Sequence, residues 1–276
     1  YTLASMRRYA TELYPALEAE TGVATSWHDP GSFRVAYEPI EIDWLKGQLG
    51  VGAYAGLEMD WVGPEVIAKH HPLYDVSRIV GAIWTPRDGH VDPSGATSAL
   101  LTGARNRCAV TSRRNRVLEI NRRPDGDWDV VTEQGTVTCE HVVNAAGHYS
   151  PQLGAMSGID IPIVSMIHQY LITESLPEMA AQEVEMPVIR DPRSSCYYRR
   201  EIDSLLIGPY ETRNSITYGL DRIDWNLHFH LTPPDLEQLA PWLEISAERF
   251  PVFAEAGIKQ VVSGPLALIH IRRCRR

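Results

Sequence analysis

The chain has 276 residues, of which 44% are hydrophobic and 22% are charged, and its formal net charge is −9. This composition is typical of a globular protein with a sizeable core, and the length predicts roughly two domains or lobes. The acidic balance argues against a nucleic-acid partner, although a local pair of arginines can still bind a small anion.

The spacing of the cysteines and the hydropathy of the chain indicate the cellular compartment of the protein. Cys108, Cys139, Cys196 and Cys274 lie far apart without a CxxC pair, which fits a reducing compartment and offers no zinc site. No apolar run approaches the length of a membrane span, and the sequence shows no signal peptide. We therefore expect a protein without membrane contact, located in the cytoplasm.

The first half of the chain predicts a mixture of helices and strands. Apolar residues recur at helical spacing from the start to Gly22, and Pro15 predicts a kink or a second short helix. Residues 31–38 alternate as a strand, and residues 81–93 are loop-rich. Further helices are expected at residues 39–56, 64–72 and 93–107.

The second half predicts mainly strands. They are expected at residues 108–112, 116–123 and 128–133 and within residues 136–147, which end in a turn of small residues, and they dominate from residue 161 onward. A helix at about residues 233–250 closes this region. The pattern predicts an α+β (α/β) fold of two interleaved lobes, the second built on a mainly antiparallel β-sheet.

One predicted strand, VSMIHQYLIT (residues 164–173), carries a histidine in its middle. Because strand side chains alternate between faces, His168 shares a face with Met166, Tyr170 and Ile172. This is the more apolar face, where an imidazole needs a partner or loses its charge. The strand CYYRR likewise places Tyr197 and Arg199 on one face. These two residues predict either amphipathic packing or a carboxylate clamp.

Two glycine-containing motifs and the histidines are candidate sites for a cofactor or a metal ion. Residues 50–55 match GxGxxA, but helical spacing precedes them, so we interpret them as part of a glycine-rich helix. The segment VVNAAGHYS (142–150) is either a tight strand–helix turn or a backbone that closely approaches a ligand. His90 is interpreted as a loop residue, and no set of histidines has metal-ligand spacing, so no metal is expected.

Taken in order, the segments GSFRVA, DGHVDPSGAT, VVNAAGHYSPQLG, IVSMIHQYLITE, CYYRR and LLIGPYE are similar to one enzyme family. They resemble the flavin-dependent amine oxidoreductases of the D-amino-acid-oxidase superfamily, in the branch of dimethylglycine and sarcosine dehydrogenases and oxidases. The likeness extends from residue 1 to about residue 265.

The resemblance implies a reaction and the residues that perform it. A hydride passes from an N-methyl carbon of a small amino acid to FAD, and the iminium is hydrolysed to formaldehyde and the demethylated amine. His168 would take the amine proton or position the substrate, and Tyr197 would orient the histidine or the substrate. Arg199 would contact the substrate carboxylate. Oxygen or an electron-transfer flavoprotein would then accept the electrons.

The resemblance also implies where FAD binds. Backbone groups at Val117 and in the turn Asn144, Ala145, Ala146 and Gly147 would contact the cofactor. On this basis residues 1–276 form one partial FAD-dependent oxidoreductase domain with an FAD-binding portion at about 75–160. The substrate-binding sheet would take about 22–74 and 161–262, leaving an atypical tail at 266–276.

The sequence departs from the family in ways that affect this expectation. No GxGxxG unit, flavin-attachment histidine or folate-binding portion is recognisable, so we expect an inactive fragment of a larger enzyme. Two alternatives stay open. One is an FAD enzyme for another secondary amine or a hydroxy acid, and the other is a non-catalytic module that binds a small carboxylate.

Overall fold

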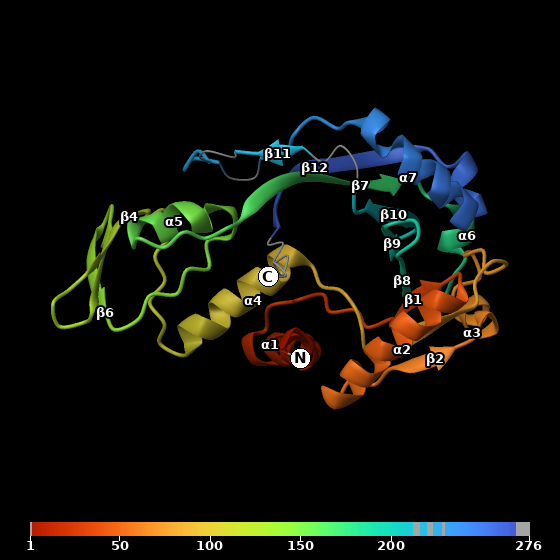
Figure 1. Cartoon of the computed structure of the whole chain (residues 1–276), viewed down its shortest axis with the longest axis horizontal. Helices are drawn as coiled ribbons and strands as arrows, with labels where there is room; N and C mark the ends of the chain where they lie inside the picture. The colour runs from red at the N-terminus through yellow and green to blue at the C-terminus, as the bar shows by residue number, and fades with distance from the viewer. Residues whose placement is uncertain (1, 212–215, 220–222, 228–229, 269–276) are drawn as a thin grey trace. The chain divides into compact units, whose positions relative to one another are not determined.

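The computed structural model describes residues 2–211, 216–219, 223–227 and 230–268 (Figure 1). Contacts within the chain define two units. Unit 1 consists of residues 1–110, 169–212 and 235–262, and unit 2 consists of residues 111–168, 213–234 and 263–276. Each unit therefore combines segments that are distant in the sequence.

A large sheet forms the centre of unit 1. Its strands follow the order β7-β10-β9-β8-β1-β3-β2, and all neighbours pair antiparallel except β1 and β8, which pair parallel. The strands are β1 (Ser32–Ala36), β2 (Asp60–Val62), β3 (Gly81–Thr85), β7 (Val164–Thr173), β8 (Val188–Asp191), β9 (Cys196–Glu201) and β10 (Ser204–Pro209). A further strand, β12 (Ile258–Leu268), pairs with β7.

The main hydrophobic core packs against one face of this sheet. Phe33, Ile189, Tyr198 and Ile207 lie opposite one another on successive strands of this face, and each is fully buried. Phe250, which follows the helix α7 (Leu236–Arg249), belongs to the same core cluster. Burying side chains of this size contributes roughly 1.5–3 kcal/mol each, so the core determines which face of the sheet is turned inward.

The helices of unit 1 begin largely as the sequence predicts. They are α1 (Thr2–Thr21), α2 (Pro39–Tyr54), α3 (Pro64–His70), α4 (Pro93–Asn106), α6 (Pro177–Ala180), α7 and the 3-10 helix η2 (Pro251–Glu255). Pro15 lies inside α1 without ending it. The GxGxxA match lies in the last turn of α2 and the residue after it, and a Cβ on Gly52 would lie 2.4 Å from the sulfur of Met59. Close packing therefore accounts for this glycine, which confirms the interpretation of a glycine-rich helix.

Unit 2 contains a small antiparallel sheet with strands β4 (Val117–Arg122), β5 (Trp128–Thr132) and β6 (Gly135–Cys139). β4 and β5 are joined by a turn at which Gly126 has φ +99°, a value that glycine adopts without steric strain. The 3-10 helix η1 (Gly147–Tyr149) and the helix α5 (Ser150–Met156) follow the sheet. β11 (Thr217–Tyr218) pairs with Ser165 and Met166 of β7.

Three predictions about secondary structure were wrong. Residues 81–85, expected in a loop, form β3, because pairing with β1 and β2 on both sides outweighs the local turn signals. Residues 108–112 and 141–143, expected as strands, have no regular secondary structure. Their β-branched residues favour extended backbone, but no neighbouring strand among the described residues pairs with them.

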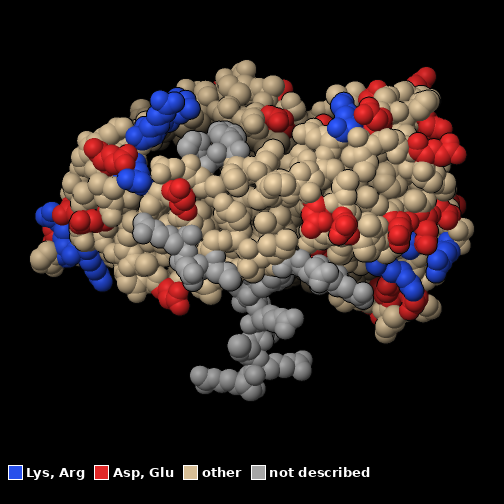
Figure 2. Space-filling model, turned by 90° about the horizontal axis from the view of Figure 1, so that it is seen from above, with Lys and Arg blue, Asp and Glu red and all other residues tan. Residues whose placement is uncertain are grey.

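The units also divide the chain at other positions than the predicted lobes. Residues 75–110, expected in the FAD-binding portion, lie in unit 1, since β3 is an inner strand of the large sheet. The predicted tail at 266–276 lies mostly outside the described residues, as does Cys274. None of the described helices has both the length and the apolar character required to cross a membrane. Figure 2 shows acidic and basic side chains interspersed over the visible face.

A buried polar network reinforces the core side of the sheet. The carboxylate of Asp191 accepts hydrogen bonds from Tyr37 Oη at 2.8 Å, Tyr74 Oη at 3.3 Å and Arg249 Nε at 3.1 Å. The side chains of Asp191 and Arg249 are 0% and 6% exposed. Burial, followed by the Asp191 charge, raises the pKa of Tyr37 and of Tyr74, so both phenols stay protonated and donate.

We expect Asp191→Ala to lower the free energy of unfolding by about 3–5 kcal/mol, because it leaves the guanidinium of Arg249 buried without its counter-ion. Chemical denaturation measures this change. Asp125→Ala is the control, because it breaks an ion pair with Arg123 whose side chains are 55% and 41% exposed, and its effect should be far smaller. Equal effects of the two substitutions would contradict a stabilising role of the network.

Candidate functional site

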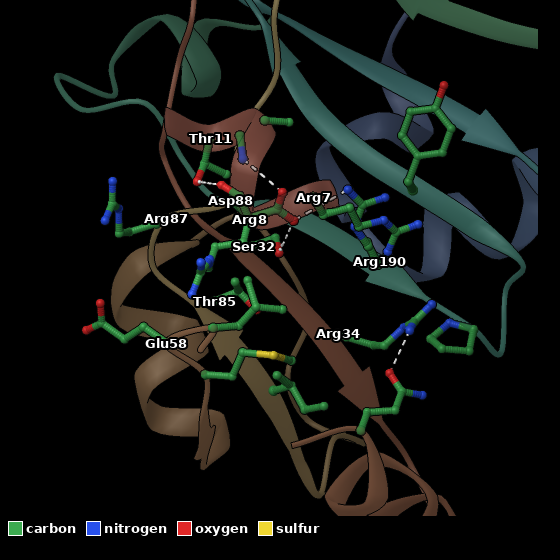
Figure 3. A pocket seen from close by; sticks show the side chains of 18 of the residues that line it. Arg7, Arg8, Thr11, Ser32, Arg34, Glu58, Thr85, Arg87, Asp88 and Arg190 are labelled. Carbon is green, nitrogen blue, oxygen red and sulfur yellow. Dashed lines mark hydrogen bonds and ion pairs between the residues drawn. The ribbon is translucent and has the colours of Figure 1, made fainter. Parts of the chain in front are cut away.

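A cavity of about 780 Å³ opens on the other face of the large sheet and lies entirely within unit 1 (Figure 3). Helix α1, strands β1 and β3, the turn after β3 and strands β8 and β9 contribute its walls. Its volume is in the range of small-molecule sites. The lining includes five arginines, which are Arg7, Arg8, Arg34, Arg87 and Arg190. Glu12, Glu58, Asp88 and Asp191 also line it, so the arginines exceed the carboxylates by one. This local positive excess in a chain of net charge −9 indicates a site for an anion.

The pairing of the strands aligns three of the lining residues. Arg34 on β1 lies beside Arg190 on β8, and Arg190 lies opposite Tyr197 on β9. Because paired residues share a face, these three side chains form a row across the sheet. Tyr197 in turn lies opposite Gly208 on β10, where a Cβ would be 2.1 Å from the tyrosine Cζ. Gly208 therefore leaves the space that the phenol ring occupies.

Arg34 has spare hydrogen-bonding capacity in this row. Its Nη1 donates to Gln48 Oε1 at 2.7 Å, and its guanidinium lies 5.5 Å from the ring centre of Trp44. Its Nε is buried and has no hydrogen-bond partner among the described residues. Burial, followed by the charge of Arg190, lowers the pKa of Arg34. A carboxylate would supply both the counter-charge and the missing acceptor.

Asp88 balances part of the positive charge in the cavity (Figure 3). Its Oδ2 accepts a hydrogen bond from Ser32 Oγ at 2.7 Å and lies 3.5 Å from Arg190 Nη2. Its Oδ1 accepts from the backbone N–H of Gly89 at 3.0 Å. Asp88 thus holds the turn after β3 against the sheet and partly neutralises Arg190.

Tyr197 is a neutral hydrogen-bonding group in the cavity. Burial, followed by the nearby Tyr210, raises the pKa of its phenol, so the group keeps its proton at neutral pH. The rings of Tyr197 and Tyr210 are tilted against each other with centroids 5.7 Å apart. The phenol can therefore donate to or accept from a bound ligand, and it is not a proton-abstracting base.

Comparison with known proteins identifies the family of this site. The chain matches the FAD dependent oxidoreductase family (DAO) over residues 1–272. The chain belongs to this family. The family binds FAD, which confirms the expectation of an FAD-dependent oxidoreductase of mixed α and β structure.

Individual relatives agree with this assignment. Mitochondrial dimethylglycine dehydrogenase of Mus musculus is 37% identical over 262 residues, which cover 92% of this chain and 30% of the relative. Mitochondrial sarcosine dehydrogenase of Mus musculus is 30% identical over 264 residues, covering 90% of this chain and 27% of the relative. The chain therefore spans under a third of the length of these relatives.

Solved structures show the same fold at lower sequence identity. L-proline dehydrogenase from P. horikoshii superposes with a TM-score of 0.80 at 22% identity, covering 96% of this chain and 67% of that chain. Glycine oxidase from Geobacillus kaustophilus superposes with a TM-score of 0.71 at 20% identity, covering 97% and 66%.

The structure places His168 on the partly exposed face of β7. Met166, Tyr170 and Ile172 share that face, whereas Ser165, Gln169, Leu171 and Thr173 are buried on the other. The more apolar face of this strand is therefore not the more buried one, because Gln169 and Thr173 are buried with hydrogen-bond partners.

Strand pairing relates the His168 face of β7 to the cavity side of the sheet. Ile172 pairs with Leu206, which pairs with Arg199, so the face of Ile172 is that of Tyr197. The boundary between the two units falls between His168 and Gln169. Tyr197 belongs to unit 1 and lines its cavity, whereas His168 belongs to unit 2. The role of His168 therefore stays a prediction.

Arg199 and the cavity arginines differ in their surroundings. Arg199 shares a face with Tyr197, but its Nη2 pairs with Glu201 Oε2 at 2.6 Å and it does not line the cavity. Its contact with a substrate stays a prediction. Arg34 and Arg190 were missed by the sequence analysis, because each is a single arginine in an apolar strand and only strand pairing brings the two together.

The residues predicted to contact FAD lie in unit 2, where Val117 begins β4. Asn144, Ala145 and Gly147 are exposed. Asn144 stabilises the turn, since its Nδ2 donates to Ser150 O at 3.0 Å and its Oδ1 accepts from Ala146 N at 3.3 Å. Gly147 has φ +56° and open space where a Cβ would be. An exposed turn of small residues fits close approach by a cofactor.

We expect Gly208→Ala to destabilise the chain by about 1–3 kcal/mol, because the new methyl group would overlap the ring of Tyr197. Adding Tyr197→Ala should restore part of the loss, since it removes the overlapping ring. Urea denaturation measures both effects. Gly47→Ala is the control, because it lies in α2 with nothing within 4 Å of a Cβ and should not destabilise. A Gly208→Ala chain as stable as the unmodified one would contradict the close approach.

Proposed function

We propose that this chain supplies the substrate-binding sheet of an FAD-dependent enzyme that oxidises a small N-methyl amino acid of the dimethylglycine or sarcosine type. The observation that carries the proposal is the row of Arg34, Arg190 and Tyr197 in one cavity. The similarity to dimethylglycine and sarcosine dehydrogenases supports the choice of substrate.

The row matches the parts of such a substrate. Arg34, with its unpartnered Nε, would bind the carboxylate, and Arg190 would add charge beside it. The neutral phenol of Tyr197 would contact the amine end or a group that positions it. Two charged anchors at one end and a phenol at the other would orient a molecule of only a few carbon atoms.

The chemistry requires a free electron pair on the substrate nitrogen. We propose that His168 accepts the ammonium proton, after which a C–H bond of the N-methyl group breaks and the nitrogen lone pair forms a C=N bond. FAD, when bound, supplies the acceptor for that hydride. Water then adds to the iminium carbon, and the C–N bond breaks to release formaldehyde and the demethylated amine.

Three further expectations accompany the proposal. We infer that the 276-residue chain alone is inactive, because the cofactor contacts expected in it are limited to Val117 and the turn at 144–147. Oxygen or an electron-transfer flavoprotein is the proposed electron acceptor. A cytoplasmic location stays a prediction, and the two dehydrogenases named above are mitochondrial.

The carboxylate anchor is tested in the FAD-loaded enzyme that contains this sequence. We expect Arg34→Gln to raise the KM for dimethylglycine roughly 10- to 100-fold, because a hydrogen bond to a charged group contributes about 1.5–3 kcal/mol. Steady-state kinetics measure the change, and the exposed Arg78→Gln serves as the control. An unchanged KM in Arg34→Gln would refute the anchor. Turnover of glycerol-3-phosphate in preference to either amine would favour a hydroxy-acid enzyme.

The roles proposed for His168 and Tyr197 are tested by measuring kcat. In the same enzyme we expect His168→Ala to lower kcat by roughly 10²- to 10⁴-fold, the usual contribution of general-base catalysis. Tyr197→Phe should lower kcat less, because it removes one hydrogen bond and keeps the ring. Formaldehyde release measures both, with the exposed Tyr9→Phe as control. A loss of affinity at constant kcat would instead show that the two residues bind the substrate without taking part in its chemistry.

Cofactor retention by the isolated chain is a separate test. We expect the purified 276-residue chain, mixed with FAD and passed through a gel-filtration column, to elute without stoichiometric flavin absorbance, because a dinucleotide needs more backbone donors than one exposed turn offers. The full enzyme treated in the same way is the control. A stoichiometric yellow complex of the isolated chain would contradict this expectation and remove the reason given for its inactivity.

A further inference from the structure

Three side chains of unit 1 meet outside the cavity. They are His28 before β1, His90 in the turn after β3, and Glu185 before β8. His28 Nδ1 lies 2.6 Å from Glu185 Oε2, and His90 Nε2 lies 2.7 Å from Glu185 Oε1. Each oxygen of one carboxylate thus faces one imidazole nitrogen, although Glu185 is separated from the histidines by 157 and 95 residues.

The backbone determines the placement of the two imidazoles. His28 and His90 form an isolated antiparallel bridge, with each backbone N–H donating to the other residue's carbonyl oxygen at 2.9 Å. Their rings stack with centroids 5.1 Å apart and an interplanar angle of 7°. A Cβ on Gly89 would lie 1.9 Å from the His28 carbonyl oxygen, so a glycine is needed for this approach. The rings are therefore held side by side before any ligand binds.

We propose that His28, His90 and Glu185 form a binding site for a divalent transition-metal ion of the zinc class. Two imidazole nitrogens and a carboxylate oxygen are ligands that such ions prefer. The candidate ligand atoms all lie within 4.8 Å of one another. Metal–ligand bonds of about 2.0–2.2 Å place neighbouring ligand atoms roughly 3–3.5 Å apart. To admit an ion, the Glu185 carboxylate would move away from the two imidazole nitrogens, which lie 2.6 and 2.7 Å from it, and the two rings would turn to direct both nitrogens at the ion.

The exposure of the cluster suits a site with open coordination positions. The side chains of His28, His90 and Glu185 are 51%, 23% and 28% exposed, so an ion can enter and retain water ligands. Three protein ligands with water completing the shell are a common zinc arrangement. Without an ion, hydrogen bonds between the imidazoles and the carboxylate occupy the same positions.

The proposed ion would order the wall of the cavity. Asp88 and Gly89, which line the cavity, directly precede His90 in the turn after β3. An ion held by His28, His90 and Glu185 would connect this turn to the segments before β1 and β8. Its role would then be to stabilise the segment that carries Asp88. The site is independent of the proposed N-methyl amino acid chemistry.

Metal titration of the chelator-treated chain tests the site. We expect isothermal titration with Zn²⁺ to show one saturable site and Co²⁺ to give visible d–d absorption. Zn²⁺ at 100 times its Kd should raise Tm by roughly 5 °C, and a chelator should reverse the shift. His90→Ala and Glu185→Gln should each weaken binding at least 10-fold, whereas the exposed His141→Ala should not.

The variants separate binding from folding. Glu185→Gln is nearly isosteric, so its fold is checked by circular dichroism, and His28→Gln at an exposed position provides a second ligand deletion. Absence of a saturable Zn²⁺ site in the unmodified chain would overturn the proposal. So would full-affinity binding by folded Glu185→Gln and His28→Gln chains, because the ion would then be held elsewhere.

Discussion

The alternation of side chains across β1, β8, β9 and β10 is the constraint on which the rest of the structure depends. One face of these strands carries Phe33, Ile189, Tyr198 and Ile207, which form the buried core. Each strand therefore has to turn its remaining side chains to the other face. A shift of the pairing by one residue would exchange the two sets, so the free energy of the core also determines which side chains line the cavity.

The neighbouring residues Arg190 and Asp191 of β8 place side chains on opposite faces of the sheet. Arg190 lines the cavity beside Arg34, while the carboxylate of Asp191 is buried with Tyr37 and Arg249. Adjacent residues of one strand thus carry opposite charges to opposite sides of the sheet. Each charge has its own compensation, from Asp88 on the cavity side and from Arg249 on the core side. Arg34, beside Arg190, keeps its Nε without a hydrogen-bond partner among the described residues.

Segments between the strands complete the two sites described for unit 1. The turn after β3 supplies Asp88 to the cavity and His90 to the histidine–glutamate cluster. Gly89 allows that turn to approach the backbone of His28, and Gly208 allows the ring of Tyr197 to lie over β10. In both places the absence of a side chain on glycine allows the close approach.

Local sequence patterns predicted most of the helices, the faces of the strands and the family of the chain. Helical spacing located α1, α2, α4 and α7, and strand alternation placed Tyr197 with Arg199 and His168 with Tyr170. The ordered motifs indicated an FAD-dependent oxidoreductase, which the family match confirms. Helical spacing and strand alternation depend on residues only a few positions apart, and each motif is itself a short segment, so a single sequence is sufficient to reveal them.

Tertiary structure alone decided which distant segments meet. β3 became an inner strand against its own turn signals, and parallel pairing of β1 with β8 brought Arg34 to Arg190. The contacts of Glu185 with His28 and His90 span 157 and 95 residues. The spacing of residues along a chain carries no information about such pairs, because they form where the burial of apolar surface, summed over the whole sheet, is most favourable.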